Sequence, residues 1–578
     1  MQRPTLAKRE WLLLLAAAAL AYFYGLGGVP FVGPDEPRYA QVAREMFERG
    51  DPVTPTLAGL TWFEKPALTY WAAIAGYKLF GVSEWAARLG SALCGLLTIL
   101  IIGWIAGRVE RRSGGELGGL RLACAGVAAS CAGFIVFSRA VNFDIYLTAT
   151  VGLALGCYLV SEFEDDVRKK RLLLAGFYAG MGLALLAKGL VGVVLPGGVV
   201  ALYSLLRRRR PAQLGSLLWG LPLAALVACA WYAPVIARHG GEFIDEFFVQ
   251  HHFARYTSNR YRHPQPFYFY LLIAPLLALP WTAFLADALL RVKPSLVGRW
   301  ITDARPDTGN ALGGRVSRFA NSGGHKNDGR PSDEGGAGVD RLRLFALAWL
   351  VTPVAFFSLS GSKLPGYILP ALPGALLLAG ERLARYARGE GAEWPMRATG
   401  ALLLAFAVGC VGYAALTKEA TLSCALLVAT PVAAAGVCAS LSRGARAARA
   451  AAVVAAALLV TTLAAGCAVE VVARRETVGG LLRLAAVRGH VAGPVLNLHT
   501  VERTAEFYAA GRLLYEERGE PVKFEGANQI AELLRGRGGG ALVFVPTEYE
   551  AQVGDYQPLA AERVGDNGRV ALYAVRLR

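Results

Sequence analysis

Long apolar segments separated by short polar loops recur along most of the 578-residue chain. A helix that crosses a bilayer needs about 20 apolar residues, and about thirteen segments approach that length. Their expected helical cores are 11–27, 88–107, 121–137, 144–161, 172–187, 189–206, 215–236, 267–289, 343–359, 367–383, 398–416, 422–440 and 450–472. The pattern predicts a polytopic α-helical membrane protein with about 13 transmembrane helices, which make up a membrane domain over residues 1–474.

The pattern changes after the last apolar segment. Short β-branched runs alternate with helical ones, which is typical of a small α/β domain. The expected strands are Val495–Leu498, Ala541–Val545 and Val570–Val575, and the expected helices are Thr504–Tyr515 and Gln529–Arg535. Residues 475–578 are therefore predicted to form a small soluble α/β domain, because about 100 residues suffice for an independent unit.

The net charge of +17 would suit a nucleic-acid partner, but the positions of the charge argue against one. The basic clusters fall in short loops on one side of the threaded chain, at Lys169–Arg171, Arg207–Arg210, Arg382–Arg388 and Arg443–Arg449. The positive-inside rule makes that side cytoplasmic. The excess charge thus predicts a multi-pass protein of a bacterial-type cytoplasmic (inner) membrane, with some affinity for anionic lipids and no nucleic-acid partner.

The same threading starts the N-terminus in the cytoplasm and assigns each loop to a side. The first loop, 28–87, the loop 237–266 and the tail 475–578 are then external, or periplasmic. The loop 291–342 is cytoplasmic. Its centre, Asp307–Gly338, is poor in apolar residues and is predicted to be disordered.

The nine cysteines show no metal-ligand spacing. Most of them lie inside predicted spans, where a cysteine behaves as a small apolar residue. We therefore expect them to be small core residues.

Two adjacent carboxylates, Asp35 and Glu36, lie just beyond the first apolar segment, and Glu64 and Lys65 follow before the chain re-enters the membrane. Charge held this close to hydrocarbon is costly, so it marks a candidate functional site. Two structural alternatives remain open. Asp35 would serve as the N-cap of a helix beginning at Glu36–Pro37, and Lys65 would snorkel from a helix end.

Other polar residues reach the same external face in the threading. They comprise the acid Asp144, the cations Arg255 and Lys363, the hydroxyls of Tyr39, Tyr70, Tyr256, Tyr268 and Tyr367, and the imidazoles of His251, His252 and His263. Fixed cations and carboxylates at a lipid boundary suit a substrate with a phosphate head and an apolar tail. A carboxylate there would take a proton from an attacking hydroxyl or balance an oxocarbenium-like sugar.

Each of these residues also has a structural interpretation. Asp144 would cap the span that follows it, and Lys188 would mark the end of a span. His251 and His252, with Arg255, would bind a metal or phosphate or form a solvated helix face. Ser360–Pro370 would be a plain hinge between spans.

Several of these segments together resemble a known family. The first external loop, with Asp35–Ala40, Gly50–Asp51, Pro55 and Trp62–Trp71, looks like that of the lipid A aminoarabinose transferase and protein O-mannosyltransferase group. These are GT-C fold, polyprenyl-phosphate-dependent glycosyltransferases. Further matches are Phe143–Asp144, Ala187–Gly189 with Leu195–Pro196, His252–Tyr256, His263–Tyr268 and Ser362–Pro370. The resemblance extends to about residue 385.

The resemblance implies a sugar donor on a polyprenyl (undecaprenyl) phosphate, and a glycolipid such as lipid A or a protein as acceptor. Asp35 is then the main catalytic carboxylate with Glu36 beside it, and Lys65 and Arg255 hold the donor phosphate. The expected substrate cavity comprises Arg38, Tyr39, Tyr70, Asp144, His251, His252, Tyr256, Lys363 and Tyr367. We expect a single-displacement, inverting transfer by a monomer. No cofactor is required, and a divalent metal, with His252 and Glu64 as ligands, stays open.

Two other classes of function remain as alternatives. A polyprenyl-linked lipid transporter, or flippase, would need polar residues along a path through the bilayer midplane. The centres of spans such as Gly192–Val200 and Val453–Leu463 carry no charge, whereas the polar candidates gather at one boundary. An external binding module on a membrane anchor would not need so many spans. The pattern therefore favours an enzyme.

Overall fold

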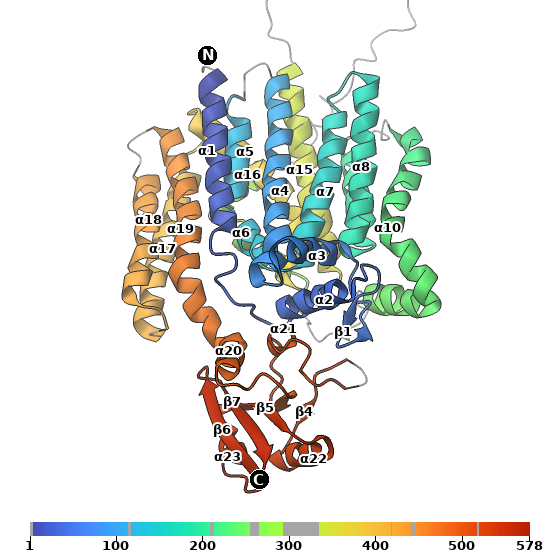
Figure 1. Ribbon diagram of the computed structural model, residues 1–578. Coiled ribbons are helices and arrows are strands. Elements are labelled where there is room, and N and C mark those ends of the chain that lie inside the picture. The colour runs from blue at the N-terminus through green and yellow to red at the C-terminus, as the bar shows by residue number, and fades with distance from the viewer. Residues whose placement is uncertain are drawn as a thin grey trace, which may run out of the picture.

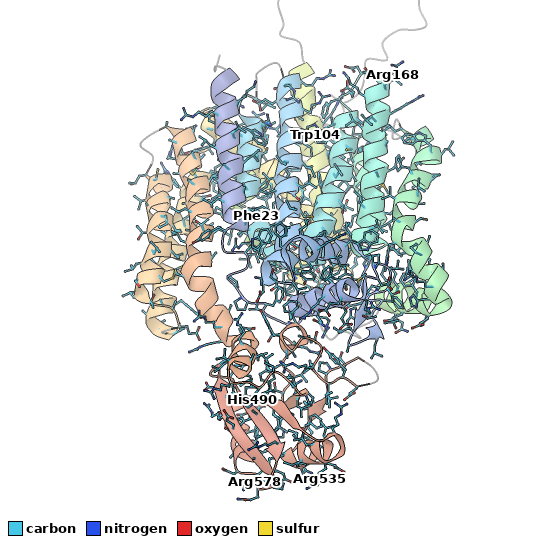
Figure 2. The ribbon with its side chains drawn as sticks, in the orientation of Figure 1. Phe23, Trp104, Arg168, His490, Arg535 and Arg578 are labelled. Atoms are coloured by element: carbon cyan, nitrogen blue, oxygen red, sulfur yellow. A yellow bond between two sulfur atoms is a disulfide. The ribbon has the colours of Figure 1, made fainter. Side chains whose placement is uncertain are left out.

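The computed structural model describes residues 4–113, 117–208, 213–254, 265–292, 334–417, 419–441, 445–516 and 519–578. Long helices stand side by side in one layer, and a small sheet domain projects from one end of them (Figure 1). Phe23, at the end of helix α1 (Pro4–Phe23), lies near the end of the bundle that faces this domain. Arg168, at the start of α8 (Val167–Lys188), lies at the opposite end (Figure 2). The predicted helical bundle with a small C-terminal α/β domain has this shape.

Each predicted span contains helix. Besides α1 and α8, these are α4 (Glu84–Arg112), α5 (Leu120–Ala129), α6 (Ala132–Ser138), α7 (Phe143–Ser161), α9 (Val191–Leu206), α10 (Leu217–Phe243), α12 (Phe269–Leu277), α13 (Thr282–Leu290), α15 (Glu334–Ser358), η3 (Pro365–Ala371), α16 (Leu372–Ala387), α17 (Trp394–Thr417), α18 (Leu422–Ser440) and α19 (Arg446–Arg475). Among the described residues, eight helices are long and apolar enough to cross a membrane, or nine if α5 and α6 count as one, so the predicted number of about 13 spans is not confirmed. The chain is thus a multi-pass membrane protein.

Two predicted spans are broken, and their breaks meet. The segment 121–137 divides into α5 and α6, which are bent by 53°, and the segment 267–289 divides into α12 and α13 around Pro280. The Ala132 amide donates to the Leu279 carbonyl at 2.8 Å, and the Trp281 indole donates to Ser130 Oγ at 2.9 Å. Polar backbone freed inside a bilayer must find protein partners, and here each break supplies the other.

Helix α15 begins earlier than the sequence predicted. Residues 334–338 were expected to belong to a disordered loop and are helical, while 293–333 lie outside the described residues. Val339 and Leu342 are buried, and Arg343 pairs with Glu381 of α16 at 2.7 Å. Packing against a neighbouring helix therefore extends α15, which sequence periodicity alone does not show.

The first loop folds across the end of the bundle, where helices α2 (Asp35–Arg49) and α3 (Leu68–Phe80) lie transverse to the long helices (Figure 1). A two-stranded hairpin, β1 (Thr56–Leu57) and β2 (Leu60–Thr61), connects them. Helix α2 is amphipathic: Val42, Ala43 and Met46 are buried, while Glu48 is exposed. Gly50, with φ of 66°, adopts the left-handed conformation that ends it.

The C-terminal domain holds a five-stranded sheet in the order β4-β3-β5-β7-β6. Its elements are α20 (Gly479–Val487), β3 (Val495–Leu498), α21 (Ala505–Tyr508), β4 (Lys523–Phe524), α22 (Ala527–Arg537), β5 (Gly540–Pro546), η4 (Thr547–Tyr549), α23 (Ala551–Gly554), β6 (Leu559–Asp566) and β7 (Val570–Leu577). Strand β3 pairs in parallel with β4 and β5, whereas β7 is antiparallel to β5 and β6. Hydrophobic clusters cover both faces.

The three strands predicted for this domain and the helix at 529–535 are confirmed. The helix predicted over Thr504–Tyr515 is wrong, because α21 stops at Tyr508 and Ala510 and Gly511 adopt positive φ. Strand β6 was missed. It lies at the edge of the sheet and carries Glu562 and Arg563, so it lacks an apolar run.

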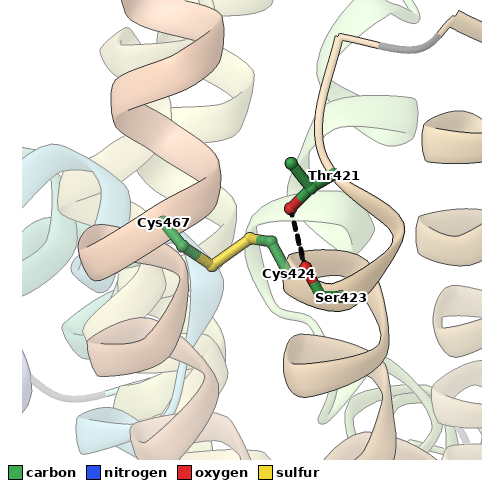
Figure 3. Close-up of a disulfide and its surroundings, with 4 residues drawn as sticks. All are labelled: Thr421, Ser423, Cys424 and Cys467. Atoms are coloured by element: carbon green, nitrogen blue, oxygen red, sulfur yellow. Dashed lines mark hydrogen bonds between the residues drawn. A yellow bond between two sulfur atoms is a disulfide. The ribbon is translucent and has the colours of Figure 1, made fainter.

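The expectation that the cysteines are small core residues is wrong at four positions: Cys229 and Cys438 are exposed, and Cys424 and Cys467 are bonded to each other. Cys424 of α18 and Cys467 of α19 form a disulfide between the two helices (Figure 3). Cys124, Cys131 and Cys157 are free and buried, as expected of small core residues. The disulfide lies near the start of α18 and toward the end of α19, which is the end of the bundle that carries the C-terminal domain.

Candidate active site

Asp35 is the first residue of α2, and its side chain is exposed. Pro34 occupies the N-cap position and no side chain caps the helix, so the interpretation of Asp35 as an N-cap is wrong. Within the described part of the chain, no hydrogen bond or ion pair of the Asp35 carboxylate is found. Asp35 is therefore available to a substrate.

The neighbouring carboxylate, Glu36, has a different environment. It is 6% exposed and forms two charge-assisted hydrogen bonds with Arg88 of α4, at 2.7 and 2.8 Å. It also accepts from the Val141 amide at 2.9 Å. Arg88 donates as well to the carbonyls of Leu26 and Pro30. Glu36 thus anchors the first loop to α4 and to the segment before α7, and its geometry argues for a structural role.

Arg38, one turn into α2, connects the first loop to the C-terminal domain. Its guanidinium donates to both oxygens of Glu506, at 3.1 and 3.2 Å, and lies 5.3 Å from the centre of the Trp62 ring. Phe507, the residue after Glu506, is packed into the apolar core of the loop. Its ring meets Phe31 edge-on at 4.8 Å. The C-terminal domain therefore helps to hold α2 in place.

Lys65 lies near the same helix in a buried ion pair. Its ammonium is 2.7 Å from the Glu64 carboxylate, and Lys65 is only 9% exposed. A snorkelling lysine keeps its charge in water, and Lys65 does not. The residue thus holds a fixed positive charge within the first loop.

Tyr70 of α3 lies among these charges. Its side chain is fully buried, and within the described residues its hydroxyl has no hydrogen-bond partner. Burial raises the pKa of Tyr70 well above its usual value, and the nearby Glu64 carboxylate raises it further. Arg38 opposes this rise and Asp35 adds to it. The phenol therefore stays protonated. Asp35, Arg38 and Glu64 lie near it.

A second polar group, at the start of α7, adjoins the first through one aromatic ring. Phe143 makes edge contacts with Tyr39 at 4.7 Å and with Tyr70 at 5.4 Å. The next residue, Asp144, forms an ion pair with Lys188 at the end of α8. Phe143 thus joins the loop residues to the helix-end residues in one site.

Asn142, rather than Asp144, caps α7, because its side chain accepts from the Ile145 amide. The interpretation of Asp144 as a cap is therefore wrong. The Lys188 ammonium also lies 4.4 Å from the centre of the Tyr367 ring. Gly366 lets the chain pass close to this pair, since a Cβ there would lie 2.3 Å from Asp144 Oδ2.

Lys188 was not among the predicted site residues. The available signal was a single lysine between two apolar segments, with a glycine after it. Lys363, which was predicted, instead ties loops together. Its ammonium donates to the carbonyls of Ser360 at 2.7 Å and Gln265 at 3.0 Å. The structure thus places Lys188 beside Asp144, whereas Lys363 connects loops through hydrogen bonds to backbone carbonyls.

Three predicted residues, Arg255, Tyr256 and His263, lie outside the described residues. His251 and His252 lie on a π-helix, η2 (Ile244–Ala254), whose last side chains are not described. Among the residues searched in the described part of the chain, no group of three His, Cys, Asp or Glu side chains is placed to hold a metal. Glu64 is paired with Lys65, and a neighbouring ammonium disfavours a metal cation.

The described site therefore consists of one exposed acid above a set of fixed, paired charges and aromatic rings. The Lys65 and Lys188 ammonium groups are held in buried or half-buried ion pairs. Each of these cations can receive an anionic group by exchanging its carboxylate partner for that group. Asp35 can then accept a proton or balance a developing positive charge beside that group.

Comparison with known proteins shows which family and which relatives the chain is similar to. A model of the dolichyl-phosphate-mannose-protein mannosyltransferase family matches residues 9–236. The undecaprenyl phosphate-alpha-4-amino-4-deoxy-L-arabinose arabinosyl transferase of Pseudomonas paraeruginosa is 31% identical over 404 residues, which cover 69% of this chain and 64% of the relative. The namesake from Edwardsiella ictaluri is 31% identical over 379 residues, or 64% and 59% of the two chains.

A solved structure matches nearly the whole chain. ArnT from Cupriavidus metallidurans, bound to undecaprenyl phosphate, superposes with a TM-score of 0.72 at 25% identity and covers 98% of each chain. By sequence alone, the chain spans about 64% of the length of the first curated relative.

Proposed function

The chain has the GT-C glycosyltransferase fold, and on this premise we propose that it transfers a sugar from a polyprenyl phosphate to an acceptor at the external face of the membrane. The observation that carries the proposal is Asp35, an exposed carboxylate without a partner in the described part of the chain, at the start of the helix that also carries the paired cation Arg38. The similarity to arabinosyl transferases makes undecaprenyl phosphate carrying 4-amino-4-deoxy-L-arabinose the first donor to assay. A lipid A-like glycolipid is the first acceptor, ahead of protein.

The proposed chemistry is a single displacement with inversion. The acceptor oxygen attacks the anomeric carbon, the bond from that carbon to the phosphate oxygen breaks, and polyprenyl phosphate leaves. Lys65 and Arg255 hold the leaving phosphate. The Lys65 ammonium gives up its ion pair with Glu64 and binds the phosphate instead. Negative charge on the phosphate grows as the bond breaks, so this interaction strengthens in the transition state and lowers the barrier.

The role of Asp35 depends on the acceptor. A hydroxyl must lose its proton as it attacks, and Asp35 is placed to take that proton. An acceptor phosphate is already ionised, so Asp35 would instead stabilise the positive charge that develops on the sugar. In both cases the proposed steps use residues of a single chain, which supports the expectation of a functional monomer.

Two independent features support the periplasmic side for this chemistry. The Cys424–Cys467 disulfide lies at the same end of the bundle as α2 and the C-terminal domain, and bacterial disulfides persist in the periplasm rather than the cytosol. Basic loops lie at the opposite end, where Arg168 is found. Together they support a bacterial inner-membrane protein with a periplasmic active site.

The test is transfer by the purified full-length chain in proteoliposomes. Labelled undecaprenyl-phosphate aminoarabinose and lipid A are supplied together, and products are identified by mass spectrometry. The proposal expects a lipid A product that is heavier by one aminopentose unit. Movement of labelled donor between leaflets without a new glycosidic bond would instead identify a flippase and overturn the proposal.

A further inference from the structure

A cavity of about 340 Å³ lies at the end of the bundle opposite the candidate active site. It is formed where α1, α4 and α5 meet, and its wall includes Trp11, Trp104, Arg111 and Arg121. Trp104 lies in the half of the bundle nearer Arg168 (Figure 2). That half carries the basic loops, so the cavity faces the cytoplasmic leaflet.

Both arginines border one glycine. A Cβ on Gly107 would lie 3.1 Å from Arg121 Cδ and 3.6 Å from Arg111 Nη1. The Arg121 guanidinium is also stacked over Trp11, 3.9 Å from the ring centre. Trp11 in turn packs against Gly103, where a Cβ would lie 2.5 Å from the indole. Small residues on α4 thus leave the space in which two like charges are held together.

The pairing of neighbouring arginines shows that this arrangement is unusual for the helix. On the same turns of α4, Arg108 pairs with Glu164 and Arg112 pairs with Asp165. Within the described residues, neither Arg111 nor Arg121 forms an ion pair with a carboxylate.

Among the described residues, the neighbouring acid Glu110 is occupied by backbone groups. It accepts from the amides of Gly119 and Arg121, both at 2.9 Å. Two guanidinium groups beside one engaged carboxylate leave net positive charge in the cavity, which an anion would neutralise.

We propose that this cavity binds the phosphate of an anionic phospholipid from the cytoplasmic leaflet. Arg111 and Arg121 hold the phosphate, and the indoles of Trp11 and Trp104 contact the glycerol and upper acyl chain. The cavity also includes Leu100, which is 41% exposed on the outside of the bundle. Leu100 and Arg111 are separated by about 16 Å along the helix. This length spans both headgroup and acyl depth, which favours a lipid over a free phosphate ion.

The experiment is native mass spectrometry of the full-length chain titrated with phosphatidylglycerol and, separately, with phosphatidylcholine. One arginine near an anionic lipid surface contributes about 1 kcal/mol, which corresponds to about 5-fold in affinity. We therefore expect R111Q and R121Q each to weaken retention of the first phosphatidylglycerol about 5-fold, and the double variant about 30-fold. Retention of phosphatidylcholine, whose choline cation balances its phosphate, should be weakened less than that of phosphatidylglycerol by each substitution.

Three comparisons keep the result specific. The matched control R112Q removes a charge from the same helix end, where Arg112 is already paired, and should retain lipid like the unmodified chain. The double variant R111K/R121K keeps both charges and tests binding if the glutamine variant does not fold. Equal weakening by R112Q, or unchanged retention by the double glutamine variant, would overturn the proposal. Displacement of the lipid by an equal concentration of inorganic phosphate would overturn the assignment to a lipid.

Discussion

The two ends of the helix bundle use charge in different ways. At the end opposite the C-terminal domain, arginines are paired with nearby acids: Arg207 with Glu162, Arg382 with Asp287, and Arg449 with Glu393. At the end that carries the C-terminal domain, Glu36 and Asp144 are paired in the same manner, but Asp35 is exposed at the start of α2. Paired charges hold helices together and satisfy topology. Among the described residues, Asp35 at one end and Arg111 and Arg121 at the other form no ion pair, and these groups are available to ligands.

Adjacent residues of the first loop show this contrast most sharply. Asp35 and Glu36 have the same chemistry and differ in burial and partners. We therefore expect substitution of the exposed Asp35 to remove activity and substitution of the buried Glu36 to lower stability.

The largest effect is expected from Asp35→Asn. Loss of a general base or of an electrostatic partner should lower the rate of transfer by about 10²- to 10⁴-fold. The thermal unfolding midpoint should not change, because the side chain has no partner among the described residues. The rate is measured in proteoliposomes under single-turnover conditions. Glu48→Gln, an exposed acid on the same helix, is the control and should keep full activity.

Glu36→Gln should destabilise the chain by about 3–5 kcal/mol, because it leaves Arg88 buried without its charge partner. The measurement is the unfolding midpoint of purified protein in detergent, together with the amount of folded protein in the membrane. A variant that unfolds like the unmodified chain but has lost transfer would place Glu36 among the reacting groups and break the contrast.

Phe507→Ala tests whether the C-terminal domain positions α2. Removing a buried ring that packs on Phe31 should cost about 3 kcal/mol, and the loss should appear as separation of the domain from the first loop. Limited proteolysis between the last helix and the sheet would detect it. Ala substitution of Phe524, whose strand β4 is an edge of the sheet, is the control and should leave the first loop protected.

The smallest effect is expected from Cys424→Ser, at about 2 kcal/mol. This loss of stability should be seen only when the protein is prepared without reductant. Cys438→Ser, a free exposed cysteine on the same helix, should have no effect. If reductant changes the stability of Cys424→Ser and of Cys438→Ser equally, the disulfide does not form in the cell. It then no longer supports the periplasmic side.

The sequence predicted the bundle well because a membrane span is a local pattern of apolar residues. It did not predict the bends in α5–α6 and α12–α13, since each bend depends on hydrogen bonds such as that from Ala132 to Leu279. The site shows the same limit. Proximity to the membrane singled out Asp35 and Glu36, but only the structure shows that Arg88 engages Glu36. Lys188 was undervalued because its partner, Asp144, is distant in sequence.

The most direct test of the central claim is a cryo-EM structure of the Asp35→Asn variant with intact polyprenyl-phosphate sugar bound. The account predicts that the donor phosphate lies within about 4 Å of the Lys65 ammonium and that the anomeric carbon faces the side chain at position 35. A donor whose phosphate binds elsewhere, with position 35 facing empty solvent, would contradict it.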